Sequence, residues 1–494
     1  MIATSSRLAD LRRALQALHA GEFATAMSRS AGWAGGMDLE AGLIHALAIA
    51  AGGDTCAALA LARIARSRPQ ANHPVQDLLD LLRRQGRPAA AVPHLRAAMA
   101  EMPEDARLPA LLGALLAEVG PMADSVAAFQ HAVALRPDGA AWSNLGKALA
   151  AEGRFAEAED AFNHALSLAP DDPQLALNRA VALLKSGRLA EGWAAFGCRH
   201  RLPDRSRPLP GPKLTGLDGL QGRTVLLRHE EGFGDTLQFI RYAPLLAAHG
   251  ARVIAWVPAP LLRLITRVPG VTAVVPPGAL PPPYDTWCPM LSLPQVFGTT
   301  LDHPPPAAPY LAADPAEAAQ QAAMLPSTGL PNTGLRVGVA WAGAARATDP
   351  AAAATDRVRS MTPDVLAPLG QLPGVRLVSL QFGVRAPAGM LDLMPGVRDF
   401  ADTAAIIANL DAVVSVDTAV AHLAAGMGKP VFLLDRYDNC WRWLHGRTSS
   451  PWYPTLQVHR QPSPGDWASA VAGAAAALSG FRRLPARPPA AAPG

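Results

Sequence analysis

Glycines recur at nearly constant spacing along the first part of the chain. The intervals between successive turn glycines are 34, 34, 33 and 34 residues, at Gly52, Gly86, Gly120, Gly153 and Gly187. Prolines repeat with the same period, at Pro69, Pro103, Pro137 and Pro170. This period is typical of a helix–turn–helix unit, in which glycine permits the turn and proline ends the second helix. The N-terminal part is therefore predicted to be an α-solenoid.

One unit carries the side chains of such a repeat most completely. Trp142, Leu145-Gly146, Phe162, Ala165 and Pro170 follow one another in the order of the tetratricopeptide repeat, which this segment resembles. We count roughly five to six units over residues 7–200 and expect the solenoid to span residues 1–200. Such modules mostly bind proteins, so the resemblance implies a protein partner or acceptor. The alternative is a solenoid that only supports the next domain.

Beyond the solenoid the pattern changes to short apolar runs alternating with helical segments. Residues 201–221 are rich in proline and glycine, which predicts a linker. The alternation predicts parallel sheets covered on both faces, as a Rossmann-like lobe over 222–330 and a second over 331–480. Residues 481–494 are expected to form a disordered tail. The expected strands of the first lobe are 224–228, 253–257 and 271–275, followed by a last short segment at 284–291. Those of the second lobe are 336–341, 375–380, 397–400, 412–416, 431–434 and 456–459. The expected helices include 237–248, irregular near Pro244, then 261–266, 362–369, 403–409, 418–426 and 465–478.

The segment 415–430 combines a strand, a tight turn and a helix in the second lobe. Asp417 and Thr418 follow an apolar run, and small residues such as Ala419 come next. Thr418 is a good N-cap, and a helix N-terminus at the carboxyl end of a parallel strand can bind an anion. His422, about one turn further, is placed to donate a hydrogen bond to that anion. The alternative is an ordinary strand–helix junction with a satisfied histidine.

A glycine-containing turn in the first lobe carries a carboxylate. Gly232, Gly234, Asp235 and Thr236 lie where the first expected strand of that lobe gives way to a helix. A carboxylate at this edge can accept a proton from a substrate hydroxyl, as a general base in group transfer must. The alternative is a plain Asp N-cap. The dinucleotide fingerprint is excluded because no third glycine follows at the required spacing.

Three further polar residues lie near expected cleft edges. Arg357 and Arg359, on a segment expected to be extended, can clamp phosphate oxygens, or can belong to a solvated loop. Gln381 ends an expected strand and can contact a base or sugar, or simply start a loop. The tryptophans of segments 439–444 and 450–454 suit stacking on a sugar or base as well as packing, and we favour packing.

Together these segments resemble the two-lobed (GT-B) glycosyltransferases over roughly residues 220–478. They are similar to the heptosyltransferases of glycosyltransferase family 9 and, more distantly, to protein O-GlcNAc transferase. The resemblance matches Asp235 to the family's proposed base and Asp417–His422 to its segment at the donor diphosphate. It implies transfer of a hexose or heptose from a nucleotide-sugar donor. The usual Gly-Asn-Pro after the first strand's Trp is replaced here by Ala344-Ala345-Arg346, after Trp341-Ala342-Gly343. The family's usual Lys has no clear counterpart, although Arg357 or Arg359 can replace its charge.

Composition narrows the classes of function. The net charge is +4, with dispersed basic residues, which argues against nucleic acid. The four cysteines are scattered and form no metal-binding spacing, which fits a reducing compartment. No apolar run has the length of a membrane span, so we expect a cytoplasmic protein. We expect no metal and no cofactor beyond the nucleotide-sugar substrate. The alternatives to a transferase with a protein acceptor (a flagellin, for example) are a glycolipid transferase and an inert scaffold that binds a nucleotide sugar.

Overall fold

The structure is a computed structural model that describes residues 2–34, 39–54, 57, 60–61, 64–65, 73–203, 208–306, 309–325, 334–343 and 350–481. The chain divides into two compact units, Met1–Asn178 and Arg179–Gly494. This boundary lies inside one helix, whereas the sequence pattern places the end of the solenoid at residue 200. Of the expected tail, residues 482–494 lie outside the described part.

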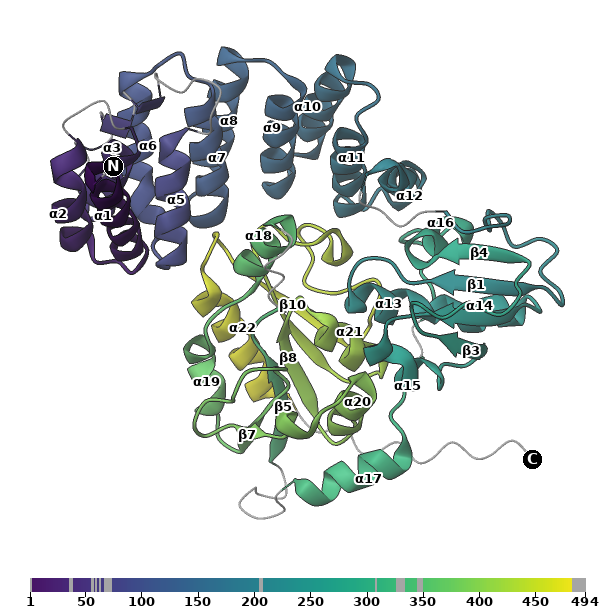
Figure 1. Ribbon diagram of the computed structural model, residues 1–494. Coiled ribbons are helices and arrows are strands. Elements are labelled where there is room, and N and C mark those ends of the chain that lie inside the picture. The colour runs from purple at the N-terminus through teal and green to yellow at the C-terminus, as the bar shows by residue number, and fades with distance from the viewer. Residues whose placement is uncertain are drawn as a thin grey trace. The chain divides into compact units, whose positions relative to one another are not determined.

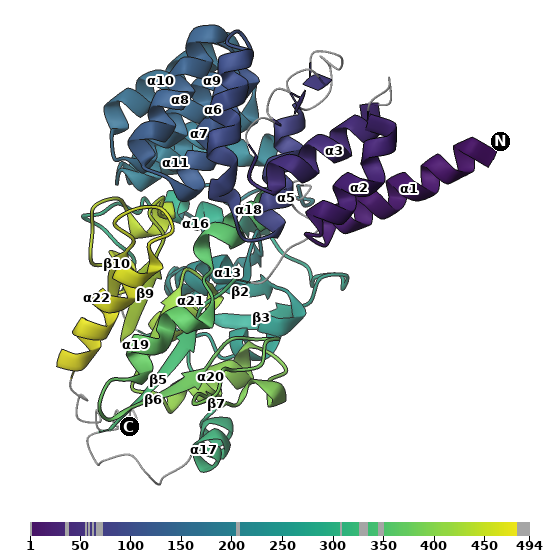
Figure 2. The ribbon, with the colours of Figure 1, turned by 90° about the vertical axis from the view of Figure 1, so that its left-hand side faces the viewer.

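The first unit is helical, as predicted, and most of its consecutive described helices pack as antiparallel neighbours (Figures 1 and 2). The helices are α1 (Ile2–His19), α2 (Phe23–Ala34), α3 (Leu39–Ala51), α5 (Pro74–Arg84), α6 (Val92–Glu101), α7 (Arg107–Val119), α8 (Met122–Leu135), α9 (Gly139–Ala151), α10 (Phe155–Leu168) and the first part of α11 (Pro173–Lys185). Gly153 has φ +78°, as a tight turn requires. Gly120 instead has φ −123°, and a Cβ there would lie 2.6 Å from Leu116.

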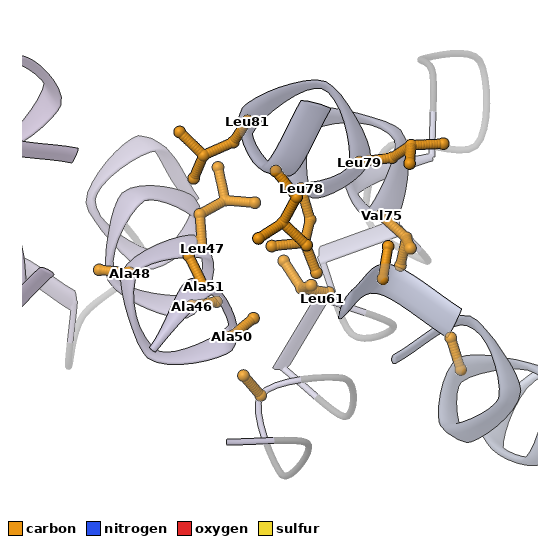
Figure 3. Close-up of a cluster of buried hydrophobic side chains, with 14 of the residues drawn as sticks. Ala46, Leu47, Ala48, Ala50, Ala51, Leu61, Val75, Leu78, Leu79 and Leu81 are labelled. Atoms are coloured by element: carbon orange, nitrogen blue, oxygen red, sulfur yellow. The ribbon is translucent and has the colours of Figure 1, made fainter. Parts of the chain in front are cut away.

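Aliphatic side chains from α3, α5 and the segment between them form a continuous core in this unit. Leu47, Leu61, Leu78 and Leu79 are all at least 94% buried. Figure 3 shows Leu47, Leu61 and Leu78 close together beside alanines of α3. Full burial of a leucine contributes about 1.5–3 kcal/mol to stability. Since aromatics are few in this region, small and aliphatic residues provide most of the packing.

The same glycine–phenylalanine contact occurs in two successive repeats. A Cβ on Gly113 would lie 2.9 Å from the Phe129 ring, and one on Gly146 would lie 2.9 Å from the Phe162 ring. In each repeat the ring of the second helix therefore rests directly on the backbone of the first. The missing Cβ sets how closely the two helices approach.

The second unit holds two parallel sheets, which confirms two Rossmann-like lobes after a solenoid. The first sheet has the order β3-β2-β1-β4, from β1 (Thr224–Arg228), β2 (Arg252–Trp256), β3 (Val271–Val275) and β4 (Thr286–Pro289). The second has the order β10-β9-β8-β5-β6-β7, from β5 (Leu335–Ala340), β6 (Val375–Ser379), β7 (Leu391–Asp392), β8 (Ala412–Val416), β9 (Val431–Asp435) and β10 (Leu456–Arg460). In the second lobe α19 (Ala367–Gly370) and α22 (Trp467–Gly480) cover one face, and α20 (Phe400–Ala408) and α21 (Ala419–Gly426) the other (Figure 1).

The helical segment expected over 237–248 is interrupted as its proline suggested. It consists of α13 (Phe233–Phe239), a 3₁₀ turn (Ile240–Tyr242) and α14 (Ala243–Ala248), with Pro244 in the first turn of α14. Proline is tolerated there because the first-turn N–H groups have no partner inside the helix. In the same lobe lie α15 (Leu262–Ile265) and α16 (Leu293–Val296).

Two sequence-based predictions of secondary structure were wrong. The expected strand 397–400 is instead an irregular segment that leads into α20 at Phe400, because Asp399 accepts hydrogen bonds from Ala401 and Asp402 and caps that helix. The segment with Arg357 and Arg359 is not extended but ends the helix α18 (Pro350–Arg359), since the alanines before it favour a helix. A helix not predicted, α17 (Pro315–Met324), has no buried residue and so lacks the apolar stripe that signals one.

We expect Gly146→Ala to destabilise the first unit by about 1–3 kcal/mol, because the new methyl would overlap the Phe162 ring. Gly32→Ala in α2 is the matched control, since no atom lies within 4 Å of its Cβ position. That change should be neutral or stabilising by up to about 1 kcal/mol. Urea unfolding measures the stability of both variants. Hydrogen exchange of the α9 amides in addition measures the local effect of Gly146→Ala. Equal stability of the two variants would contradict the packing role of Gly146.

Candidate functional site

The N-terminus of α21 follows β8 directly, as the sequence predicts, but its first turn is not capped by a side chain. Thr418 occupies the N-cap position with φ −137° and ψ 172°. Its hydroxyl does not cap the helix and lies 3.1 Å from Oγ of Ser415 instead. Thr418 therefore stands at the predicted N-cap position, but the prediction that its hydroxyl caps the helix is wrong, because that hydroxyl contacts Ser415 instead. Uncapped first-turn N–H groups beside Asp417 and Ala419 are suited to an external anion.

His422 lies one turn into α21 and is only 4% exposed. Its ring stacks on Trp443 with centroids 5.2 Å apart, and Nδ1 lies 3.0 Å from the Tyr453 hydroxyl. Burial lowers the pKa of His422 to about 3, although nearby Asp417 opposes this shift. The imidazole is therefore neutral at physiological pH. When Tyr453 donates to Nδ1, the ring proton is on Nε2, which lies 3.9 Å from Oδ1 of Asp417.

The glycine turn of the first lobe lies directly against α21. Helices α13 and α21 pack together, and a Cβ on Gly234 would lie 2.9 Å from Cδ2 of His422 and 3.6 Å from Cα of Ala419. Gly232 precedes α13 at the N-cap position. The two turns that the sequence singled out lie far apart along the chain, at Gly234 and Ala419, and are thus brought together by the packing of the two lobes. This contact is the centre of the candidate site.

Asp235 lies in the first turn of α13 with both carboxylate oxygens engaged. Oδ2 accepts a hydrogen bond of 2.8 Å from the N–H of Gly232, and Oδ1 pairs with the guanidinium of Arg442. Asp235 and Arg442 have side chains only 14% and 13% exposed. Next to Asp235, Thr236 is buried, and its hydroxyl lies 2.6 Å from Nδ1 of His229.

Arg442 is a site residue that the sequence reasoning missed. Its Nε donates to Oε1 of Gln238 at 2.8 Å, and its guanidinium lies 4.1 Å from the centroid of the Trp441 ring. Burial disfavours its charge, but Asp235, Cys440 and Asp417 more than offset this and raise the pKa of Arg442. Arg442 is therefore a fixed positive charge between the two lobes. The sequence places Arg442 between Trp441 and Trp443, and tryptophans near a turn favour packing as well as ligand contact.

The remaining predicted residues take different positions. Arg359 donates to the backbone oxygen of Asp417 at 3.1 Å and pairs with Asp356, so it adjoins the α21 turn. Arg357 is exposed. Gln381 accepts from the N–H groups of Trp341 and Ala342 and donates to the Ala342 carbonyl, so it holds the turn after β5. Contact of these three residues with a donor stays a prediction.

The tryptophans of segments 439–444 and 450–454 are buried, in agreement with the packing role that the sequence favours. Trp441, Trp443 and Trp452 are 6%, 0% and 2% exposed. Residues 344–349, which include the departure from the family pattern, lie outside the described part of the chain.

Across the described residues, no three His, Cys, Asp or Glu side chains are placed to share a metal ion. Among the helices that the structure describes, none is both long and apolar enough to cross a membrane.

Comparison with known families agrees with this architecture. Residues 139–172 match the tetratricopeptide repeat, and residues 389–440 match glycosyltransferase family 9 (heptosyltransferase). The second match includes Asp417, Thr418 and His422. The chain thus joins tetratricopeptide-repeat helices to a domain of the glycosyltransferase family 9 type. This match supports glycosyltransferase activity. The resemblance to protein O-GlcNAc transferase stays a prediction.

One curated protein and two solved structures are among those similar to this chain. Protein FlbA of Caulobacter vibrioides is 28% identical over 457 residues, which are 84% of this chain and 74% of that protein. The match to the crystal structure of a family 9 glycosyltransferase from Veillonella parvula covers 49% of this chain and 87% of the chain in that crystal structure, with 12% identity and a TM-score of 0.37. A tetratricopeptide-repeat protein from Thermus thermophilus covers 36% of this chain and 99% of its own, with 23% identity and a TM-score of 0.24.

We expect His422 to stay neutral in the folded protein at pH 5. An unfolded chain, with its His pKa near 6.5, takes up the proton first, so folding stability falls as the pH drops from 6.5 towards 3. His422→Phe keeps the stacking on Trp443 but cannot titrate. The variant should therefore lose roughly 2 kcal/mol less stability than the wild type between pH 7 and pH 5. Denaturant unfolding at both pH values measures this, and identical losses would refute a neutral buried His422.

Proposed function

We propose that this protein transfers a sugar from a nucleotide-diphosphate donor to an acceptor hydroxyl, with Asp235 as the general base. The contact of Gly234 with His422 and Ala419 carries the proposal, because it puts a carboxylate beside an uncapped helix N-terminus. A carboxylate and an anion site are the two groups that such a transfer needs on opposite sides of the reacting carbon. The match of residues 389–440 to glycosyltransferase family 9 supports the same reaction.

In the proposed reaction the acceptor oxygen attacks the anomeric carbon of the sugar while its proton passes to Asp235. The bond between that carbon and the diphosphate oxygen breaks, and its electron pair stays on the diphosphate. The first-turn N–H groups after Thr418 stabilise the growing charge. Neutral His422 contributes a hydrogen-bond donor at most, because burial keeps it uncharged. Cations must therefore supply the positive charge.

Arg442 and Arg359 are the cations that we assign to this role. Arg359 donates a hydrogen bond to the backbone oxygen of Asp417. The negative charge of Asp417 also contributes to the raised pKa of Arg442. Arg442 replaces, in this proposal, the lysine that the family pattern leads one to expect. Since a carboxylate paired with a guanidinium is a weak base, Arg442 must shift towards the diphosphate when the donor binds. That shift frees Oδ1 of Asp235 for the acceptor proton.

For the acceptor we propose a protein held by the helical repeats, with a hexose or heptose as the transferred sugar. The repeat match supports protein binding. The test follows nucleotide release from UDP-, GDP-, ADP- and dTDP-sugars while cell fractions are added. Release that rises only with a protein fraction supports this acceptor, and release that rises only with a glycolipid fraction contradicts it.

We expect Asp235→Asn to lower nucleotide release by about 10²–10⁴-fold while donor binding stays within a few-fold, because only proton transfer is lost. Asp466→Asn is the matched control, since Asp466 also accepts a hydrogen bond from a helix N-terminus but is half-buried, lies outside the site and caps α22. It should leave release unchanged. If the wild type binds a sugar nucleotide without releasing the nucleotide, and Asp235→Asn changes nothing, the protein is an inert scaffold.

We also propose that the reaction needs no metal ion, because the helix N-terminus and the two arginines supply the stabilising charge. Activity should therefore be retained in excess EDTA. The assay compares nucleotide release in EDTA with release after Mg²⁺ or Mn²⁺ is restored. Complete loss in EDTA that a divalent ion reverses would disprove this part of the proposal.

A further inference from the structure

The last helical hairpin of the repeat region belongs to the second unit. This hairpin, residues 179–203, comprises the end of α11, α12 (Leu189–Phe196) and a 3₁₀ turn (Gly197–Arg201). From sequence it is the final, imperfect repeat. In the structure it contributes buried side chains to the unit that holds Asp235 and Arg442, among them Trp193, which is 3% exposed. We call it the junction hairpin.

The junction hairpin contacts the loop of the C-terminal lobe that carries Arg442. The buried ammonium of Lys185 pairs with Asp438, and the Lys185 carbonyl accepts a hydrogen bond of 3.1 Å from the N–H of His445. Between these two points, the ring of Trp193 meets the ring of Trp441 edge-on at 5.1 Å. The loop is thus fixed to the hairpin before, at and after Arg442.

The same hairpin contacts the first lobe on the side of its glycine turn. Arg199, itself only 3% exposed, pairs with Glu230 at 3.0 Å and donates to Oγ of Ser292 at 2.8 Å. The Trp193 ring also meets Phe239, the last residue of α13, at 6.4 Å. Helix α12 packs against α16, its neighbour in Figure 1. The hairpin therefore joins the two lobes at the level of the candidate site.

The contacts continue from Trp193 to the charged pair through two tryptophans. Trp441 lies under the guanidinium of Arg442, 4.1 Å from it. Trp452, whose ring is 6.3 Å from Trp193, donates from Nε1 to the carbonyl of Arg442 at 2.8 Å. Both the backbone and the charged end of Arg442 therefore rest on rings that Trp193 contacts. A flexible arginine needs such support to meet a carboxylate with little loss of freedom on binding.

We propose that the junction hairpin holds Arg442 between the two lobes, beside Asp235 in the free protein and within reach of a bound donor, and that Trp193 is the positioning residue. The inference rests on the proposed function for its effect on turnover, but the positioning itself is independent of it. Trp193 touches neither the substrate nor the reacting atoms in this proposal. It acts through Trp441 and Trp452. The repeat region thus supplies part of the catalytic unit in addition to any partner it binds.

The experiment compares full-length Trp193→Leu, Trp193→Phe and Lys185→Met with the wild type. Trp193→Phe keeps an aromatic ring, and it loses no hydrogen bond, because the indole N–H makes none to the described residues. Trp142→Leu is the matched control, since Trp142 stacks on His164 within the first unit. Circular dichroism verifies that each variant is folded. Hydrogen exchange of segments 229–239 and 436–446 is measured without ligand, and kcat and KM with the sugar nucleotide that the wild type turns over.

We expect Trp193→Leu and Lys185→Met to speed exchange of segment 436–446 several-fold and to lower kcat by about 10–100-fold with KM within about threefold. Trp193→Phe should restore most of both properties, and Trp142→Leu should change neither. Unchanged exchange of segment 436–446 in folded Trp193→Leu and Lys185→Met would overturn the inference. If the wild type releases nucleotide from no sugar nucleotide, the proposed function fails, and the exchange of the two segments alone decides the positioning.

Discussion

The site depends on the close contact between Gly234 and His422, which is possible because Gly234 has no side chain. The ring of His422 occupies the space that a Cβ on Gly234 would need, so the first turn of α13 can lie directly on the first turn of α21. Each of these turns ends a strand of a different sheet, and neither alone has the groups for group transfer. Their contact sets the separation of Asp235 from the uncapped N–H groups after Thr418. A larger residue at position 234 would separate the two lobes at this point.

Around this contact the charges are held by burial and by pairing. Arg442 stays charged because Asp235 and Asp417 offset the cost of its burial, whereas His422, more weakly compensated, is neutral. Positive charge near the α21 turn therefore comes from arginines, whose charge does not change over the physiological pH range.

Local patterns in the sequence predicted much of this architecture. The period of the glycines and prolines predicted the solenoid, and the apolar run before Asp417 predicted β8 and the start of α21. Arg442 could not be found in this way, because its partner Asp235 lies in the other lobe and no local spacing connects them. The contact of Thr418 depends on Ser415, which competes with the helix for its hydroxyl. Helix α18 was not predicted, although the alanines before its two arginines favour a helix.

The division of the chain inside α11 has a consequence for how such proteins diverge. Arrays of helical repeats gain and lose whole units, since each unit contacts mainly its neighbours. Here the last hairpin is an exception, because its Trp193 and Arg199 form part of the core of the glycosyltransferase-type domain. A change in the number of repeats before Asn178 would leave these contacts in place, whereas loss of the hairpin after it would remove them. Diversification of partners and preservation of chemistry can therefore proceed separately along one continuous chain.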